Sequence, residues 1–229
     1  GFCGPLTSTK FKGGQSNPTY LLEATSGKYV LRRKPPGHLL ASAHAVDREF
    51  RVLTALHGSK VPVAAPYHLC KDEGVIGSMF YIMEYVEGEV FWDPSFPDFT
   101  PARRGEYYDA ILQSLAALHS VDIESVGLSD YGKAGNYFSR QISRWSEQYR
   151  AAETDDIDAM NNLIEMLPLR CPDDDGSVAL VHGDFRIDNL MFAKGKPQIS
   201  AIVDWELSTL GHPLADLGYF CMALRLPRN

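Results

Sequence analysis

The sequence predicts an α+β protein of two lobes, and three features of its order carry that prediction. The first third reads as β-hairpins accompanied by one amphipathic helix. The region after residue 100 reads as successive amphipathic helices, and residues 178–206 return to short apolar runs separated by polar loops. We expect a β-rich N-lobe at residues 1–83, a hinge at 84–88 and a mainly helical C-lobe at 89–229.

Two strands joined by a tight turn are expected early in the N-lobe. Residues 19–23 and 28–33 are rich in apolar and aromatic side chains, and Thr25-Ser26-Gly27 between them favours a turn. Two adjacent glycines, Gly13 and Gly14, precede the first of these strands. Because glycine lets backbone N–H groups approach an anion closely, this second turn either closes a hairpin or lies over phosphates.

A helix is expected over residues 43–57, and it carries an acid on its apolar face. Glu49 lies beside Phe50 on a stripe with helical spacing. A buried carboxylate needs a cation or strong hydrogen-bond donors. Glu49 therefore either lies at an edge and reaches water, or pairs with a cation from a strand, for which Arg32 is the best candidate. The apolar stripe comprises Val46, Phe50, Leu53 and Leu56.

The C-terminal region begins with a helix start at Thr100-Pro101, since proline is favoured at the first helical position. Two more amphipathic helices follow over residues 138–149 and 157–167, and we predict that their apolar stripes are core. The three aspartates of the 171–176 loop are better explained by a solvated loop than by a cation site. The predicted buried face of the first helix is Tyr108, Ile111, Leu112, Leu115 and Leu118.

Composition narrows the class of protein. The 229 residues, 45% of them hydrophobic, suffice for a sizeable core. The net charge is -7 and no basic run interleaves with aromatic residues, so we expect no nucleic-acid partner. No apolar run approaches the roughly 18 residues of a spanning helix. No signal peptide is visible, and we expect a cytoplasmic protein without membrane contact. The four scattered cysteines predict reduced thiols rather than a zinc site or disulfides.

The reaction centre is expected within residues 178–206. Four polar groups, His182, Asp184, Asn189 and Asp204, stand between apolar runs in this stretch. Such groups resist burial unless they are paired, so stability alone does not explain them. Carboxylate and amide oxygens are suitable ligands for Mg²⁺.

The run His182-Gly183-Asp184-Phe185-Arg186-Ile187-Asp188-Asn189 resembles the catalytic loop H-x-D-x-[KR]-x-x-N of the protein-kinase-like superfamily. The glycine in second place resembles the aminoglycoside phosphotransferase family. Asp204 stands where the kinase D-F-G motif begins with its metal-binding aspartate. The resemblance implies an ATP-dependent small-molecule kinase.

The same resemblance assigns roles to the loop. Asp184 orients the acceptor hydroxyl and accepts its proton, Asn189 and Asp204 bind Mg²⁺, and Arg186 contacts the transferred phosphate. His182 completes the catalytic set as a structural hydrogen-bonder rather than as a base. We expect Asp188 to face solvent.

The resemblance extends into the N-lobe and implies a site for ATP or GTP. Arg32 stands where the nucleotide lysine is expected, Glu49 resembles its helix partner, and the Glu84 carbonyl and Val86 N–H resemble the hinge groups that meet adenine. Arginine keeps the charge of lysine but differs in geometry. Lys34 is the alternative and requires a register shift. One further stretch resembles the loop that covers the nucleotide phosphates in this superfamily: Gly13, Gly14, Gln15, Ser16 and Asn17.

Two departures from the family pattern qualify these roles. The glycine loop has only two adjacent glycines, and Asp204-Trp205-Glu206 replaces D-F-G, so Glu206 is a further candidate for the metal shell. Members of the family continue into additional helices, and we therefore expect this C-lobe to be incomplete at its C-terminal end.

Four longer runs, such as K-F-K-G-G-Q-S-N-P-T-Y and V-D-W-E-L-S-T-L-G-H-P-L-A-D-L, resemble the kinase-like domain of acyl-CoA dehydrogenase family members ten and eleven. This implies a hydroxyacyl-CoA as the acceptor and an acyl-CoA dehydrogenase as a partner. Two alternatives stay open. One is a pseudokinase-like module that binds nucleotide or acyl-CoA without turnover. The other, less well supported, is a metal-dependent hydrolase.

Overall fold

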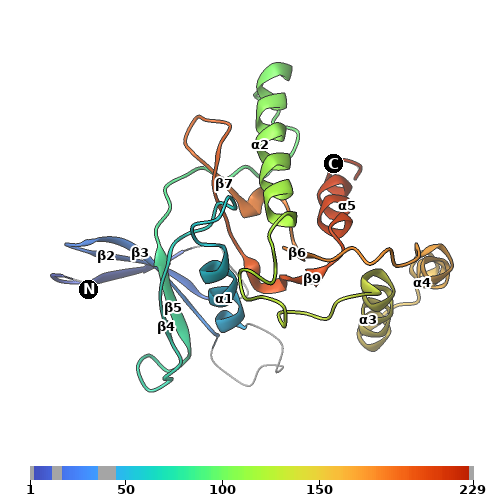
Figure 1. The fold of residues 1–229 in the computed structure, drawn as a ribbon, viewed down its shortest axis with the longest axis horizontal. Coiled ribbons are helices and arrows are strands. Elements are labelled where there is room, and N and C mark those ends of the chain that lie inside the picture. The colour runs from blue at the N-terminus through green and yellow to red at the C-terminus, as the bar shows by residue number, and fades with distance from the viewer. Residues whose placement is uncertain (1–2, 12–16, 36–44, 227–229) are drawn as a thin grey trace.

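The computed structural model describes residues 3–11, 17–35 and 45–226, and it has the predicted α+β architecture in two lobes (Figure 1). The N-lobe is a five-stranded antiparallel sheet with the strand order β1-β2-β3-β5-β4, and one helix, α1, lies beside it. The strands are β1 (Thr7–Lys10), β2 (Thr19–Ala24), β3 (Gly27–Arg33), β4 (Pro66–Cys70) and β5 (Phe80–Glu84), and α1 spans Val46–Leu56.

The predicted hairpin is confirmed and fixes the register of β3. Thr19 pairs with Arg32 at one end and Ala24 with Gly27 at the other, where Gly27 has a φ of 137° that favours glycine. On its other side β3 pairs with β5, so that Arg32 lies opposite Tyr81. This register turns Arg32 toward α1, where Val46, Leu53 and Leu56 are buried as their spacing predicts.

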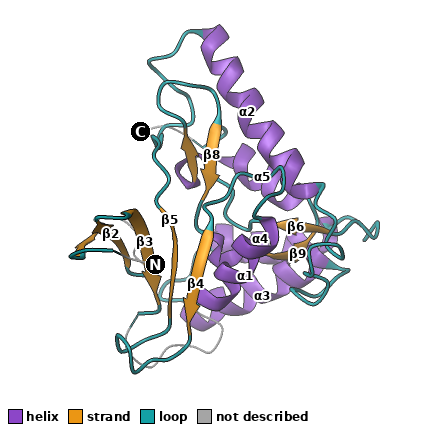
Figure 2. Cartoon of the chain, turned by 60° about the vertical axis from the view of Figure 1, so that its left-hand side comes forward, coloured by secondary structure: helices purple, strands orange, loops and turns teal. Residues whose placement is uncertain are grey.

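The C-lobe is mainly helical, with two small sheets at its centre (Figure 2). Strand β6 pairs with β9, and β7 pairs with β8, both antiparallel. The helices are α2 (Pro101–His119), α3 (Tyr137–Ala152), α4 (Asp158–Arg170) and α5 (Leu214–Ala223). The remaining elements are β6 (Ala179–Val181), η1 (Ile187–Asn189), β7 (Leu190–Phe192), β8 (Ile199–Ile202), η2 (Trp205–Leu207) and β9 (Thr209–Gly211).

One hydrophobic core joins α1, α2 and the strands around the central stretch. Helix α2 buries Tyr107, Ile111, Leu115 and Leu118, whereas the predicted core residue Leu112 is 45% exposed. The apolar stripe thus runs one position earlier at its start than predicted, because both Tyr107 and Tyr108 fit helical spacing and sequence does not distinguish them.

The prediction that α3 and α4 contribute to the core is wrong. Neither helix buries a single residue, and Trp145 of α3 is 56% exposed. The two helices pack on each other at the far side of the molecule from the N-lobe sheet (Figure 1). An apolar stripe predicts that a helix has a face to cover, but it does not predict what covers that face.

None of the helices in the described part of the chain is long and apolar enough to cross a membrane. The exact limits of the lobes and of the hinge at residues 84–88 stay predictions; strand β5 ends at Glu84.

Candidate active site

A buried ion pair joins the N-lobe sheet to α1. Arg32 Nε lies 2.8 Å from Glu49 Oε2, and Glu49 is only 1% exposed. The hydroxyl of Tyr81, the cross-strand neighbour of Arg32, donates to the same carboxylate at 2.9 Å. Asn17 Nδ2 donates to the other carboxylate oxygen at 2.8 Å. The predicted Arg32–Glu49 pairing is confirmed, and the alternative in which Glu49 reaches water is wrong.

The guanidinium of Arg32 also connects the N-lobe to the central stretch. It forms a hydrogen-bonded ion pair with Asp204 and lies 3.7 Å from Glu206. Asn17 Nδ2 bridges the same two regions, because it donates to Glu206 at 3.2 Å as well as to Glu49. Arg32 rather than Lys34 therefore faces the site, and the register shift that Lys34 requires does not occur.

Three carboxylates surround one guanidinium in this cluster. Burial alone would lower the pKa of Arg32, but the charge of Glu49, followed by those of other neighbours, raises it instead. Burial raises the pKa of Glu49 to about 7, although Arg32 and the Tyr81 hydroxyl oppose the shift. The cluster thus carries more negative charge than Arg32 neutralises, and an added cation would hold Glu49 ionised.

The donor set fits Mg²⁺. Ligand oxygens of Glu49, Asp204 and Glu206 lie within 4.8 Å of one another, and Mg²⁺ prefers such oxygen ligands. The amide oxygen of Asn17 is also buried, and none of the described residues donates to it. Asn189 uses its amide nitrogen for Asp184, which leaves its side-chain oxygen as the atom that can bind a cation.

Asp204 has a backbone conformation that is rare for a residue with a side chain. Its φ of 67° and ψ of 62° lie in the left-handed region, between the end of β8 and the start of η2. Such conformations carry strain and are concentrated at functional sites. The preceding residue, Val203, donates its N–H to the carbonyl of Asn189 at 3.0 Å, which ties the two predicted metal ligands together.

His182 is fully buried and uses both ring nitrogens for structure. Nε2 lies 3.0 Å from the Val203 carbonyl, and Nδ1 lies 3.3 Å from the Asp184 N–H. A carbonyl only accepts and a backbone N–H only donates, so the ring is neutral with its proton on Nε2. Burial lowers the pKa of His182, and Asp216 only partly opposes this. The geometry therefore supports the predicted role as a structural hydrogen-bonder.

The backbone at the start of this loop is held by an acid from α5. Asp216 accepts the N–H groups of His182 at 2.8 Å and of Gly183 at 2.9 Å, and His119 contacts the same carboxylate. Gly183 has a φ of 83°, and a Cβ placed there would lie 2.5 Å from the Leu207 carbonyl oxygen. Only glycine fits between the loop and the segment after Asp204.

Asp184 is partly exposed. Asn189 Nδ2 donates to its Oδ2 at 3.0 Å. Arg186 lies 3.9 Å from its Oδ1, too far for a hydrogen bond, and instead forms a two-point pair with Asp188. The prediction that Asp188 faces solvent is wrong, because its side chain is only 12% exposed and is used to hold Arg186.

Two sets of predicted nucleotide contacts stay predictions. Gly13, Gly14, Gln15 and Ser16 lie outside the described residues, although Asn17 at the end of that loop is described and buried. Glu84 ends β5, where its N–H and its carboxylate both bond to the backbone of Ala65. Val86 follows β5 and is half-buried.

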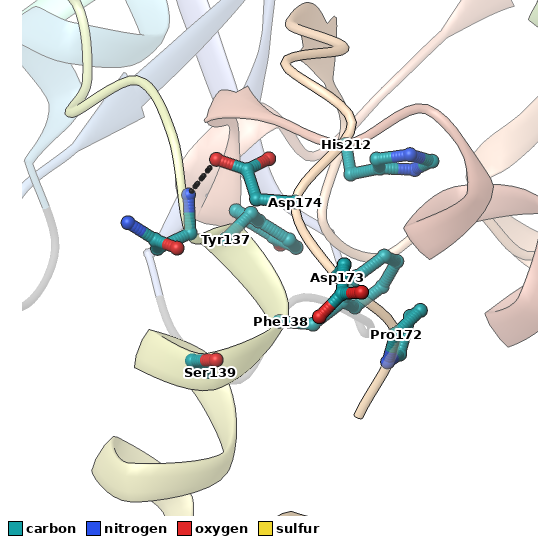
Figure 3. A pocket seen from close by; sticks show the side chains of 8 residues that line it. Tyr137, Phe138, Ser139, Pro172, Asp173, Asp174 and His212 are labelled. Carbon is teal, nitrogen blue, oxygen red and sulfur yellow. Dashed lines mark hydrogen bonds between the residues drawn. The ribbon is translucent and has the colours of Figure 1, made fainter. Parts of the chain in front are cut away.

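The acidic 171–176 loop lines a small pocket beside the start of α3, and none of the residues that line this pocket belongs to the predicted site (Figure 3). Asp174 accepts the N–H of Asn136 at 2.7 Å, and Asp175 accepts the N–H of Ser177 at 2.8 Å. Asp175 also lies 3.4 Å from His212 Nε2. These two aspartates are used to fix the loop.

Sequence reasoning missed two residues of the site: Tyr81, which donates to Glu49, and Asp216, which accepts the N–H groups of His182 and Gly183. The available signal for Asp216 was its place as a lone acid in the apolar run Leu214–Leu217.

Structural comparison defines the class of protein. The fold is that of the kinase-like aminoglycoside phosphotransferases. A crystal structure of a Ralstonia eutropha protein classed with these enzymes superposes with a TM-score of 0.90 at 50% identity, covering 100% of this chain and 67% of that chain. A thermostable variant of APH(4)-Ia, in complex with ADP and hygromycin B, shares the fold with a TM-score of 0.68 at 15% identity, covering 93% and 70% of the two chains.

The chain matches the phosphotransferase enzyme family over residues 7–228, and it belongs to that family. It is 49% identical to mouse acyl-CoA dehydrogenase family member 10, over 99% of this chain and 21% of that protein. It is 46% identical to human acyl-CoA dehydrogenase family member 11, over 98% of this chain and 29% of that protein. The chain thus spans less than a third of these curated relatives. The resemblance read from the sequence is confirmed.

Proposed function

We propose that this chain transfers the γ-phosphate of ATP or GTP to a hydroxyl of a small molecule. One observation carries the proposal: a continuous series of contacts links Glu49, Arg32 and Asp204 to Asn189 and Asp184. Membership of the phosphotransferase family supports the same conclusion. A nucleotide between the lobes would lie against the first three residues, with the acceptor on the side of Asp184.

Each group has a part in the reaction. Arg32 binds nucleotide phosphate oxygens, for which its planar guanidinium is well suited. Asp184 orients the acceptor hydroxyl and accepts its proton, and a general base of this kind contributes roughly 100- to 10,000-fold to rate. Asn189 and Asp204, with Glu206 beside them, would hold Mg²⁺, which when bound neutralises phosphate charge. Arg186, held by Asp188, is placed for the transferred phosphate.

The acceptor that we propose is a hydroxyacyl-CoA. The support is the identity of 46–49% to proteins named as acyl-CoA dehydrogenase family members. We expect an acyl-CoA dehydrogenase as the partner of this chain, and we expect both to act on the same acyl group. Aminoglycosides are the competing acceptor class, suggested by structural neighbours whose low identity indicates the fold alone.

The test is nucleotide consumption by the purified chain, or by the longer protein that contains it, against 4-hydroxyacyl-CoAs, sugars and aminoglycosides. We expect turnover only with a hydroxyacyl-CoA, and a loss of roughly 100-fold or more in Asp184→Asn. Unchanged turnover in that variant would contradict the assignment of Asp184 as the base.

A second candidate is a nucleotide-binding module without turnover. The observation that favours it is the ion pair between Arg32 and Asp204, because this pair occupies both the phosphate-binding cation and a metal-binding acid. For catalysis this ion pair must open, so that Arg32 binds the phosphate and Asp204 binds the metal. Thermal stabilisation by Mg·ATP without consumption of ATP, across the whole acceptor panel, would favour the module.

A further inference from the structure

The left-handed backbone of Asp204 persists only because neighbouring groups hold it, since this conformation costs free energy in a residue with a side chain. Trp205 is one of these groups. Its indole Nε1 donates to the carbonyl of Ile202 at 2.9 Å. The indole is buried and lies against His182, with 4.7 Å between the ring centroids. These contacts fix the chain just before and just after Asp204.

Two buried hydroxyl groups extend this support away from the strand. Ser208 Oγ donates to the carbonyl of Trp205 at 2.5 Å, and the Ser208 N–H donates to the same carbonyl at 3.1 Å. Because the serine proton is used in this way, the hydroxyl of Tyr131 is the donor in its 2.8 Å contact with Ser208 Oγ. The Tyr131 hydroxyl is thus linked, through one serine, to the residue that follows Asp204.

Helix α1 joins the same network through Arg48, the chain neighbour of Glu49. The guanidinium of Arg48 donates to the carbonyls of Tyr131 at 2.9 Å and Ser208 at 3.4 Å. It also lies over the Tyr131 ring, 4.1 Å from the centroid. The Arg48 carbonyl is a second, longer acceptor for the tyrosine hydroxyl, at 3.3 Å. Three segments, namely α1, the loop after α2 and the turn after Asp204, therefore meet at Tyr131.

We propose that Tyr131 and Ser208 are positioning residues for the acid Asp204. Their hydroxyl groups hold the turn after Asp204 against α1, and this keeps the ligand oxygens of Asp204 and Glu206 within 4.8 Å of that of Glu49. Neither hydroxyl touches these carboxylates, so both act through the backbone of the turn. The inference rests on the proposed function, because it takes Asp204 as a metal ligand.

The experiment measures binding of Mn²⁺ as a probe for the Mg²⁺ site, since the two ions share a preference for oxygen ligands. The protein is saturated with ADP and titrated with Mn²⁺, and water-proton relaxation reports the metal bound to the protein. We expect Tyr131→Phe and Ser208→Ala each to weaken Mn²⁺ affinity about two- to tenfold, the range that corresponds to one net hydrogen bond. The backbone bond from the Ser208 N–H to Trp205 remains in both variants.

The matched control is Tyr108→Phe, which removes a tyrosine hydroxyl that donates to the carbonyl of Pro94. It should lower the free energy of unfolding to a similar extent, measured by urea denaturation, and leave Mn²⁺ affinity at the wild-type value. The comparison separates an effect on the metal site from a general loss of stability.

A double-mutant cycle tests whether the effect passes through Asp204. Adding Tyr131→Phe to Asp204→Asn should weaken Mn²⁺ binding no further, because the carboxylate that the hydroxyl positions has already lost its charge. A further loss as large as in the wild-type background would overturn the assignment of Tyr131 to Asp204.

Wild-type Mn²⁺ affinity in Ser208→Ala and in every folded Tyr131→Phe sample would overturn the proposal and make the network purely structural. The proposed phosphotransferase function fails separately. It fails if the wild type consumes no nucleotide with any acceptor, even while the variants differ from it in Mn²⁺ affinity.

Discussion

The two sides of the cleft are built differently. On the side where we propose that the nucleotide binds, Arg32, Glu49 and Asn17 are buried, and the hydrogen bonds of Asn17 reach Glu49 and Glu206, 32 and 189 positions away in the chain. On the side of Asp184, where we propose that the acceptor binds, Arg186 is exposed and is held by Asp188, two residues away. Buried, multiply bonded groups are fixed before a ligand arrives, whereas exposed groups can adjust to it.

This difference suggests a division of labour. Under the proposed function, the fold fixes the groups that bind the nucleotide before it arrives, and it leaves the groups around Asp184 free to adjust to the acceptor. Substitutions on the nucleotide side should therefore change nucleotide affinity, and those on the acceptor side should change turnover.

The largest effect is expected for Asp204→Asn, which removes the charge of an acid that we propose as a metal ligand and that pairs with Arg32. Loss of charge stabilisation by a metal costs several kcal/mol in the transition state, so turnover should fall roughly 100- to 1000-fold. The measurement is kcat at saturating Mg·ATP with increasing Mg²⁺. Full activity at a raised Mg²⁺ concentration would mean that Asp204 supports affinity for the metal but not catalysis.

A smaller effect is expected for Glu49→Gln. Glutamine keeps the shape and the bond from Tyr81 but loses the charge that faces Arg32. Arg32 retains Asp204, so we expect a change of unfolding free energy of only about 1 kcal/mol, and nucleotide affinity weakened by roughly tenfold. Calorimetric titration with Mg·ATP, beside urea denaturation, separates the two. A large loss of stability with normal affinity would make Glu49 a purely structural residue.

On the acceptor side, Asp188→Asn should release Arg186 from its two-point pair. The pair is only partly exposed, since Asp188 is 12% exposed, so we expect the free energy of unfolding to fall by about 1 kcal/mol. Turnover should fall only a few-fold, because Arg186 keeps its charge and loses orientation. The control is Asp130→Asn, which frees Arg51 from a two-point pair that is more exposed and does not involve the Asp184 loop. Equal kinetic effects in the two variants would contradict a role for Arg186.

The smallest effect concerns pH. Burial lowers the pKa of His182, while in the unfolded chain the imidazole binds a proton near pH 6.5. Below that pH the unfolded chain binds more protons than the folded one, so the free energy of unfolding should fall as the pH falls. His182→Gln should flatten this dependence between pH 5 and 7, measured by urea denaturation. His68→Gln, which removes an exposed histidine, should keep the wild-type dependence.

The sequence predicted those parts of the site that are close together in the chain or follow a periodic pattern. The loop from His182 to Asn189 is continuous, and the pairing of Arg32 with Glu49 followed from an acid on an apolar stripe. The hairpin that positions Arg32 followed from its turn residues. In each case residues close together in the sequence indicated a local requirement: a partner for a buried charge, or a turn between two strands.

The rest depended on contacts that no local pattern encodes. Asn17 meets Glu206 across 189 positions, and Asp216 reaches the loop from the following helix. The sequence did not predict the exposure of α3 and α4, because an amphipathic stripe does not indicate which part of the chain, if any, packs against it.

The division between the two sides is tested most directly by one calorimetric comparison of Mg·ATP binding to wild type, Asp184→Asn and Glu49→Gln. We predict that Asp184→Asn, although inactive, binds the nucleotide with wild-type affinity, and that Glu49→Gln binds it roughly tenfold more weakly. Equal losses of affinity in the two variants would contradict separate nucleotide and acceptor sides.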